Sequence, residues 1–345
     1  MKTRMIAMVI VALGASWAST SEGKPLREIF KRVNSSVVVI NSIQTDVIGE
    51  SQSQPVSVAG LGSGVLISKD GEVITAAHVV QTANKVFVQF SSGEIMTAKV
   101  IASEPASDVA LLKLSAPPPS GATVAKLGDS DDVEVGDQIF IVGAPLGMGY
   151  TLSVGYISAR RRSDNVYSGF PLTEFFQTDA AINQGDSGGP MFNMSGEIVG
   201  IVSHIMSKSG GSEGLGFAAT ANMARQFLLE RRSLWTGVLG SYITRESAKV
   251  FNVPPPGVGM LVQHVAEDSP AALMGLHGGT ARATIEGESL VVGGDIILEV
   301  QGIPLSIGTY QQIRELIGGL GPGDRIWLKI LRGGEQLEIR SPKLP

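Results

Sequence analysis

The chain has 345 residues, 43 of them glycine and none cysteine, with 43% hydrophobic residues, 17% charged residues and a formal net charge of -5. Its length suggests two domains, because domains commonly have about 150 residues, and its acidic balance argues against a general nucleic-acid binder. The lack of cysteine excludes disulfides, thiol catalysis and cysteine-ligated metal sites. The excess of glycine without a repeat indicates a β-rich protein with many tight turns.

The first 18 residues have the pattern of a secretory signal peptide. Lys2 and Arg4 precede a short apolar run over 5–13, and small residues follow at a candidate cleavage site over 16–18. An uncleaved membrane anchor is the alternative, but a spanning helix needs about 20 apolar residues, and polar residues arrive here too early. We therefore expect an exported protein, without a stable membrane span, from which residues 1–18 are removed.

The chain then alternates short strands with turns. A helix is predicted over 25–33, and runs rich in β-branched residues after it indicate strands. These runs cover 56–68, 72–80, 85–90, 94–102 and 108–114. A proline-rich connector over 116–121 has no periodicity and divides this region into two sets of strands of similar size.

The second half of the chain contains three candidate helices. The clearest is predicted over 219–232, where Arg231 and Arg232 occupy the last turn and suit the helix dipole. After it the pattern changes to short strands mixed with candidate helices over 270–276 and 310–317. We therefore place a domain boundary near residue 233.

A glycine-rich string around Ser187 has the composition of a nucleophile turn. Gly185, Gly188 and Gly189 surround this serine, so a carbonyl substrate can approach it, and the turn can aim successive backbone N–H groups at a developing oxyanion. An ordinary hairpin loop would have a similar composition. The string alone leaves both interpretations open.

Two further residues could complete a catalytic site with Ser187, because a serine nucleophile needs a general base and an acceptor that orients the base. His78 ends a strand-like run among small residues. Asp108 stands at the start of an apolar run, where an ionised carboxylate is costly unless it is paired. Each residue alone also fits an ordinary structural role, but together they follow the order of the chymotrypsin triad. The first set of strands would supply the base and its acceptor, and the second set would supply the nucleophile.

The segments around these residues resemble the HtrA (Deg) family of trypsin-like serine proteases. The resemblance is carried by the strings TAAHVV, SDVALLKL and TDAAINQGDSGGP, and by glycine-rich segments over 60–65, 143–147 and 153–158. Segments over 237–240, 259–262, 269–272 and 293–297 resemble the PDZ domain of the same family. The family implies a mostly β fold, with a chymotrypsin-like double β-barrel protease domain over 24–232 and a smaller α+β PDZ domain over 233–345.

The resemblance assigns the catalytic roles: Ser187 is the nucleophile, His78 the general base, and Asp108 the residue that orients the base. The oxyanion hole would consist of the backbone N–H groups of Gly185 and Ser187, with Asp186 between them. These assignments are expectations.

Three other positions follow from the resemblance. Ile182 matches a position in the primary specificity (S1) pocket, which implies cleavage after small or medium aliphatic residues. Arg162 matches the arginine of the regulatory loop. Family members usually have asparagine where this chain has Asp186, and we hypothesise that Asp186 pairs with Arg160, Arg161 or Arg162 and couples that loop to the oxyanion hole. A solvated aspartate in a turn is the alternative.

A PDZ domain binds an extended C-terminal peptide as an added strand. By resemblance, Val238, Leu239, Gly240 and Ser241 form the loop that binds the peptide carboxylate, and the helix over 310–317 forms the other wall of the groove. The segment over 277–287 is longer than a compact PDZ domain needs and resembles a hairpin insertion; a surface loop without function is the alternative. The family also implies a homotrimer or a multiple of one.

Two functional classes fit the sequence. The first is an ATP-independent serine endopeptidase that degrades misfolded or damaged exported proteins in the bacterial periplasm, with the PDZ domain recruiting substrates or regulating the enzyme. The second is a chaperone or scaffold that has lost protease activity. The complete set of His78, Asp108 and Ser187 favours the first. His204, His264 and His277 have no metal-ligand spacing, so we expect no metal and no other cofactor.

Overall fold

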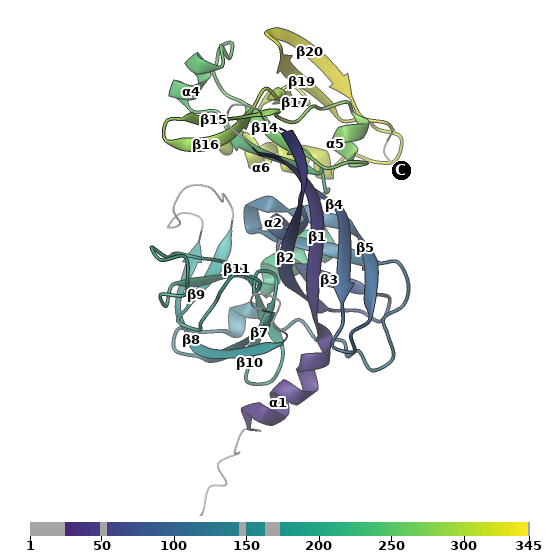
Figure 1. Cartoon of the computed structure of the whole chain (residues 1–345), viewed down its shortest axis with the longest axis vertical. Helices are drawn as coiled ribbons and strands as arrows, with labels where there is room; N and C mark the ends of the chain where they lie inside the picture. The colour runs from purple at the N-terminus through teal and green to yellow at the C-terminus, as the bar shows by residue number, and fades with distance from the viewer. Residues whose placement is uncertain (1–24, 49–53, 145–149, 163–172, 344–345) are drawn as a thin grey trace, which may run out of the picture.

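The computed structural model describes residues 25–48, 54–144, 150–162 and 173–343, and contains two closed β-barrels followed by a third sheet (Figure 1). The strand order is β1-β2-β3-β6-β5-β4 in the first barrel and β10-β11-β12-β9-β8-β7 in the second. This mostly β architecture confirms the predicted chymotrypsin-like double barrel. The predicted signal peptide lies outside the described residues.

The first barrel follows the short helix α1 (Leu26–Val33) and a 3-10 turn (Asn34–Ser36). Its strands are β1 (Val37–Ile48), β2 (Gln54–Leu66), β3 (Glu72–Thr75), β4 (Ala83–Gln89), β5 (Ile95–Glu104) and β6 (Val109–Leu114). The prediction of a strand over 72–80 is wrong in its second half, because the chain forms the helical turn α2 (Ala77–Val80) there. The apolar side chains of this turn close the end of the barrel core, so Ala77, Val79 and Val80 are buried by tertiary packing rather than by strand pairing.

The second barrel contains β7 (Gln138–Gly143), β8 (Thr151–Arg162), β9 (Glu174–Thr178), β10 (Pro190–Asn193), β11 (Ile198–Ile205) and β12 (Gly216–Thr220), with 3-10 turns at Pro105–Ser107 and Ser130–Asp132 before it. The helix predicted over 219–232 begins later and ends earlier. Residues up to Thr220 pair with β9 and β11 as part of β12, so helix α3 (Ala221–Ala224) starts after them and continues as a π-helical segment, η5 (Arg225–Glu230).

A hydrophobic cluster joins the two barrels. It contains Val37 and Val65 from the first barrel and Phe140 and Phe192 from the second, and the two phenylalanine rings stack with their centroids 5.2 Å apart. All four side chains are buried. The cluster therefore fixes the two barrels against each other and defines the cleft between them.

The C-terminal region forms a separate sheet in the order β13-β14-β17-β19-β20, with β18 paired to β17 and a two-stranded hairpin, β15–β16. Its elements are β13 (Val238–Tyr242), α4 (Arg245–Val250), β14 (Met260–Val265), α5 (Pro270–Leu273), β15 (Ala281–Ile285), β16 (Glu288–Val292), β17 (Ile296–Val300), β18 (Ile303–Pro304), a 3-10 turn (Ile307–Thr309), α6 (Tyr310–Gly318), β19 (Trp327–Arg332) and β20 (Glu335–Arg340). Two of the helices lie where they were predicted, whereas α4 was not predicted. The segment over 277–287 contributes to the hairpin β15–β16 rather than forming an irregular loop.

Figure 1 shows the C-terminal region stacked over one end of the first barrel, with the long strands β1 and β2 reaching up to it. Arg282 of the hairpin donates two hydrogen bonds of 2.9 Å to the carboxylate of Asp46 near the end of β1. The connection between the barrels and this region runs from Glu230 to Val238. Within the described part of the chain, no helix has the length and apolar character needed to cross a membrane.

Candidate active site

His78 and Asp108 form a tight pair at the edge of the cleft. His78 Nδ1 lies 2.8 Å from Asp108 Oδ2 and 2.9 Å from Oδ1, and the backbone N–H of His78 also donates to Oδ1, at 3.0 Å. Asp108 is only 5% exposed and has a left-handed backbone with φ of 52°, at the turn that starts β6. Loss of water around the imidazole lowers its pKa, but the charge and hydrogen bond of Asp108 outweigh this, so the pKa of His78 lies above its ordinary value.

Ser187 comes from the second barrel, in the turn before β10. Its hydroxyl donates to the carbonyl of Ser203 at 3.2 Å, and its own carbonyl accepts the N–H of Ser63 at 2.8 Å. His78, Asp108 and Ser187 line one cavity of about 2030 Å³. Among the described residues no hydrogen bond joins the hydroxyl of Ser187 to His78, and such bonds are often long before a substrate binds. The structure thus brings all three predicted residues to one cleft.

The turn that contains Ser187 presents two backbone donors that have no acceptor among the described residues. Gly185 has φ of 101° and Gly188 has φ of 85°, which only glycine adopts without strain. The Ser63 hydroxyl donates to the Gly185 carbonyl at 2.7 Å and anchors the turn on β2. In the described part of the chain, the N–H groups of Gly185 and Ser187 have no acceptor. They are the two groups expected to form the oxyanion hole.

The hypothesis that Asp186 pairs with a regulatory arginine is wrong for the described residues. Glu174 stands opposite Arg162 in the β8–β9 register and binds both Arg160 and Arg162 at 2.8 Å, which removes these cations from Asp186. Arg161 instead donates to the side chain of Gln177. The loop that follows Arg162 lies outside the described residues.

Asp186 is not solvated either, because its exposure is 5%. Its Oδ2 accepts the N–H of Asn183 at 2.9 Å. Burial raises the pKa of its carboxyl, and this single backbone hydrogen bond opposes the rise without cancelling it. Both the ion pair and the solvated alternative considered from the sequence therefore fail.

Sequence reasoning missed Ser203, which belongs to the same network. Its hydroxyl donates to Asp108 Oδ2 at 2.5 Å, and a register shift between Val202 and His204 in β11 turns the strand at this point. His204, which was assigned no role from the sequence, lies 3.0 Å through Nδ1 from the Ser203 hydroxyl and stacks on Phe217 at 4.9 Å. The available signal was a polar pair in the otherwise apolar strand IVGIVSHI.

Ile182 lies on the apolar wall of the cavity. It is 2% exposed, and its side chain occupies the space above Gly216, where an added Cβ would lie 2.5 Å from Ile182 Cδ1. Of the other histidines, His264 Nε2 lies 3.7 Å from Asp46, and the backbone N–H of His277 donates to Asp295 at 2.8 Å. The described residues contain no group of side chains that could hold a metal ion.

The cavity continues into the C-terminal region. Val238, Leu239 and Gly240 line it on one side, and Ile313 and Ile317 of α6 line it on the other. The first three belong to strand β13, with a register shift between Leu239 and Gly240, so the predicted carboxylate-binding segment over 238–241 is a strand rather than a loop. Its pairing with β14 imposes the extended conformation.

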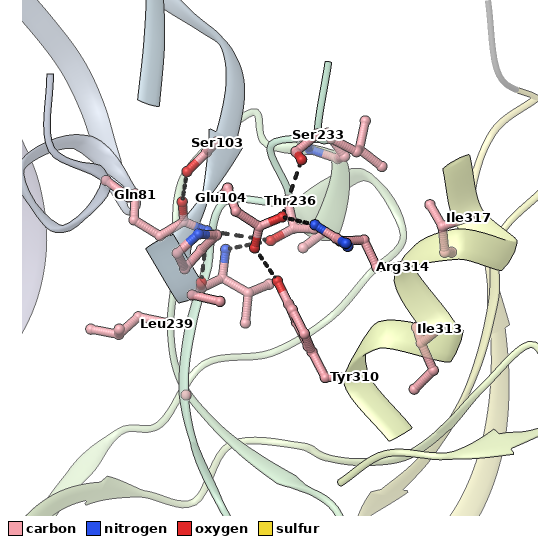
Figure 2. A pocket seen from close by; sticks show the side chains of 18 of the residues that line it. Gln81, Ser103, Glu104, Ser233, Thr236, Leu239, Tyr310, Ile313, Arg314 and Ile317 are labelled. Atoms are coloured by element: carbon pink, nitrogen blue, oxygen red, sulfur yellow. Dashed lines mark hydrogen bonds and ion pairs between the residues drawn. The ribbon is translucent and has the colours of Figure 1, made fainter. Parts of the chain in front are cut away.

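A buried carboxylate connects this groove to the first barrel. Figure 2 shows Glu104 at the centre of the contacts, with Tyr310 and Arg314 approaching from α6. Glu104 is 2% exposed, accepts the hydroxyl of Tyr310, lies 3.1 Å from the donating hydroxyl of Ser233 and forms an ion pair with Arg314 at 3.6 Å. Beside it, the Gln81 amide donates to the carbonyl of Val238 at 3.0 Å.

The chain matches one family model and several curated relatives. The family model described as a trypsin-like peptidase domain matches residues 62–201. The chain is 37% identical over 286 residues to a probable periplasmic serine endoprotease DegP-like of Pseudomonas fulva (strain 12-X), covering 81% of this chain and 55% of the relative. It is 35% identical over 328 residues to the periplasmic pH-dependent serine endoprotease DegQ of Escherichia coli (strain K12), covering 93% and 65%. The chain thus spans little more than half the length of the first of these curated relatives.

Solved structures agree with these relatives. The HtrA-type protease AlgW with a decapeptide matches with a TM-score of 0.52 and 27% identity, covering 93% of this chain and 99% of that one. AlgW with a tripeptide matches with a TM-score of 0.53 and 28% identity, covering 92% and 96%. From the two barrels, the relatives and the solved structures together, we conclude that the chain belongs to the HtrA family of trypsin-like serine proteases.

Proposed function

We propose that the chain is a serine endopeptidase. The observation that carries this proposal is that the His78–Asp108 pair and the hydroxyl of Ser187 line one cavity, while the N–H groups of Gly185 and Ser187 in the adjoining turn have no acceptor among the described residues. A nucleophile, a base with its orienting acceptor, and two preorganised donors are the parts that acyl transfer requires. The names of the relatives, which are endoproteases, give independent support.

In the proposed mechanism, the carboxylate of Asp108 accepts a hydrogen bond from the protonated Nδ1 of His78. The unprotonated Nε2 of His78 can therefore act as the base. Nε2 takes the proton of the Ser187 hydroxyl as its oxygen attacks the scissile carbonyl. The developing oxyanion accepts hydrogen bonds from the N–H groups of Gly185 and Ser187. His78 then returns the proton to the leaving amine, and water hydrolyses the acyl-enzyme by the same steps.

The substrate class proposed for this cleft is unfolded protein with aliphatic residues at the cleavage site. Ile182 gives the cleft an apolar wall, and neither Ile182 nor Gly216, on which it packs, supplies an acid that would bind Lys or Arg. The relatives named as periplasmic endoproteases support the periplasm as the compartment. Misfolded exported proteins as substrates rest on the family resemblance. Assembly as a homotrimer or a multiple of one rests on the family resemblance alone, and sedimentation velocity tests it.

The C-terminal region is proposed to bind peptide C-termini between β13 and α6 and to recruit substrates or regulate the protease. Its groove is lined by apolar Ile313 and Ile317 and opens into the same cavity as the cleft. Two of its contacts reach the catalytic elements: Gln81 caps the helical turn that carries His78, and Glu104 ends the strand that leads to Asp108. A peptide in the groove would therefore bind next to both.

Hydrolysis of unfolded casein tests the protease proposal against a chaperone or scaffold role. The full chain is incubated with casein in EDTA and without ATP, alongside Ser187→Ala and the matched control Ser195→Ala, an exposed serine in the turn before β11. We expect cleavage by the wild type and by the control, and none by Ser187→Ala. Equal persistence of casein in all three samples would reject the protease proposal, and a requirement for ATP or for a metal ion would reject the proposed cofactor-free reaction.

A further inference from the structure

Asp186 occupies a position where a negative charge is poorly compensated. It lies between the two proposed oxyanion donors, Gly185 and Ser187, and is 5% exposed. Its only hydrogen-bond donor among the described residues is the N–H of Asn183. Its Oδ1 packs on Gly143 at the end of β7, so closely that a Cβ there would lie 2.2 Å away. A carboxylate buried with a single donor costs free energy when it is ionised.

No cation of the described residues compensates this charge. Two groups of the described residues contact the Asp186 carboxyl, Gly143 from β7 and the N–H of Asn183 from its own turn, and neither of them titrates. The catalytic His78 and Asp108 are paired with each other. Of the arginines in β8, Arg160 and Arg162 are held by Glu174, and Arg161 donates to the side chain of Gln177.

The internal segments outside the described residues offer no cationic partner for Asp186. The internal segments 49–53, 145–149 and 163–172 contain no Lys, Arg or His. Residues 344–345 contain none either, so outside the described residues only the segment 1–24 contains cationic side chains. Burial raises the pKa of this carboxyl, in agreement with the geometry.

We propose that Asp186 is a positioning residue that makes the formed oxyanion hole conditional on proton uptake by its carboxyl. The neutral acid can stay in its buried site with Gly185 and Ser187 on either side in their present conformation. The ionised carboxylate is drawn out of its buried site toward water. Because peptide bonds join Asp186 to Gly185 and Ser187, this movement of Asp186 displaces the N–H donors of both residues. The inference rests on the proposed protease function, and it adds to that function a control that protonation exerts on the nucleophile turn.

The test is Asp186→Asn, which keeps the shape of the side chain and removes its charge. Initial rates on a chromogenic peptide are measured from pH 5 to 9 for the wild type, Asp186→Asn and the control Asp179→Asn, an exposed aspartate before the same turn. We expect the ratio of kcat for Asp186→Asn to that of the wild type to approach one at low pH. At high pH it should rise, by up to about tenfold for each unit by which burial raises the pKa, while KM changes little. A ratio below one at every pH, or a gain that does not vary with pH, would overturn the proposal.

Thermal unfolding gives a readout that does not depend on catalysis. Both chains carry Ser187→Ala, with and without Asp186→Asn. Because the folded-state pKa of Asp186 is raised, its ionisation destabilises the fold, so the Tm advantage of the Asn variant should grow with pH from about 3.9 up to the folded-state pKa and then level off. A Tm difference that does not vary with pH would overturn proton uptake at Asp186. If no variant hydrolyses the peptide, the protease proposal fails, and unfolding alone decides whether Asp186 holds a proton in the folded chain.

Discussion

The Ser203 hydroxyl donates a 2.5 Å hydrogen bond to Asp108 Oδ2, so Ser203→Ala should change the basicity of His78. With the donor gone, the bonds left to the carboxylate among the described residues are those to the His78 ring and backbone, at 2.8–3.0 Å. A less stabilised carboxylate attracts the imidazolium more strongly. The pKa of His78, already above its ordinary value because of Asp108, should therefore rise further.

The magnitude follows from the energy of the lost bond. A hydrogen bond to a charged group contributes about 1.5–3 kcal/mol, and one pKa unit corresponds to about 1.4 kcal/mol. The pKa of His78 changes only by the part of this hydrogen-bond energy that differs between the neutral and the charged imidazole. We therefore expect the pKa to rise by about half a unit to one unit. Since Ser203 is buried, the free energy of unfolding should also fall, by about 1.5–3 kcal/mol.

The assay is the pH dependence of kcat/KM on a peptide substrate, whose acid limb reports the pKa of the base in the free enzyme. Because His78 must be neutral to act as the base, a raised pKa moves this limb to higher pH and lowers the rate near neutrality. Ser203→Thr, which keeps a hydroxyl, serves as the control and should retain the wild-type limb. An acid limb in Ser203→Ala that stays in place or moves to lower pH would refute the assigned role of this hydrogen bond.

Three further outcomes are expected. Asp108→Asn should lower kcat by about 1,000- to 10,000-fold, because an amide favours the wrong tautomer of its histidine partner; steady-state kinetics measure this, and a loss below tenfold would contradict the assignment. Gly188→Ala should lower the free energy of unfolding by more than about 2 kcal/mol, because the new Cβ would lie 2.3 Å from a backbone oxygen. The control Gly93→Ala has a similar φ of 87° but open space around it, so it should lower the free energy of unfolding by only about 1 kcal/mol. Urea titrations measure both changes. Arg282→Gln should lower that free energy by about 1 kcal/mol by breaking its ion pair with β1, and an unchanged urea midpoint would show that the hairpin contact is not stabilising.

The strand pattern predicted two sets of short strands and the segments that meet at the cleft, and the resemblance to the HtrA family implied that the two sets close into barrels. Alternating β-branched runs specify strands through local pattern, and His78, Asp108 and Ser187 lie in strings whose composition suits their chemistry. The helical turn α2 was missed because its valines suit a strand equally well, and only the end of the barrel core makes them helical.

Features that depend on tertiary register could not be predicted in this way. The partner proposed for Asp186 failed because the β8–β9 pairing sets Glu174 opposite Arg162, which no local pattern reveals. The contact between Glu104 and Tyr310 joins positions 206 residues apart. Ser203 reaches Asp108 through a bulge in β11, and a bulge depends on strand pairing rather than on composition.

The pairing of β1 with β2 has a mechanical consequence. Twelve successive residue pairs, from Val37↔Val65 to Ile48↔Gln54, run without a register shift. The third pair from one end includes Asp46, which holds the hairpin, while Ser63 farther along β2 supports the turn at Gly185. Seven residues of strand separate Ser63 from Val56, the partner of Asp46, a span of roughly 23 Å at about 3.3 Å per residue. Backbone pairing of β1 with β2 therefore joins the strand region that holds the hairpin to the strand position that supports the nucleophile turn.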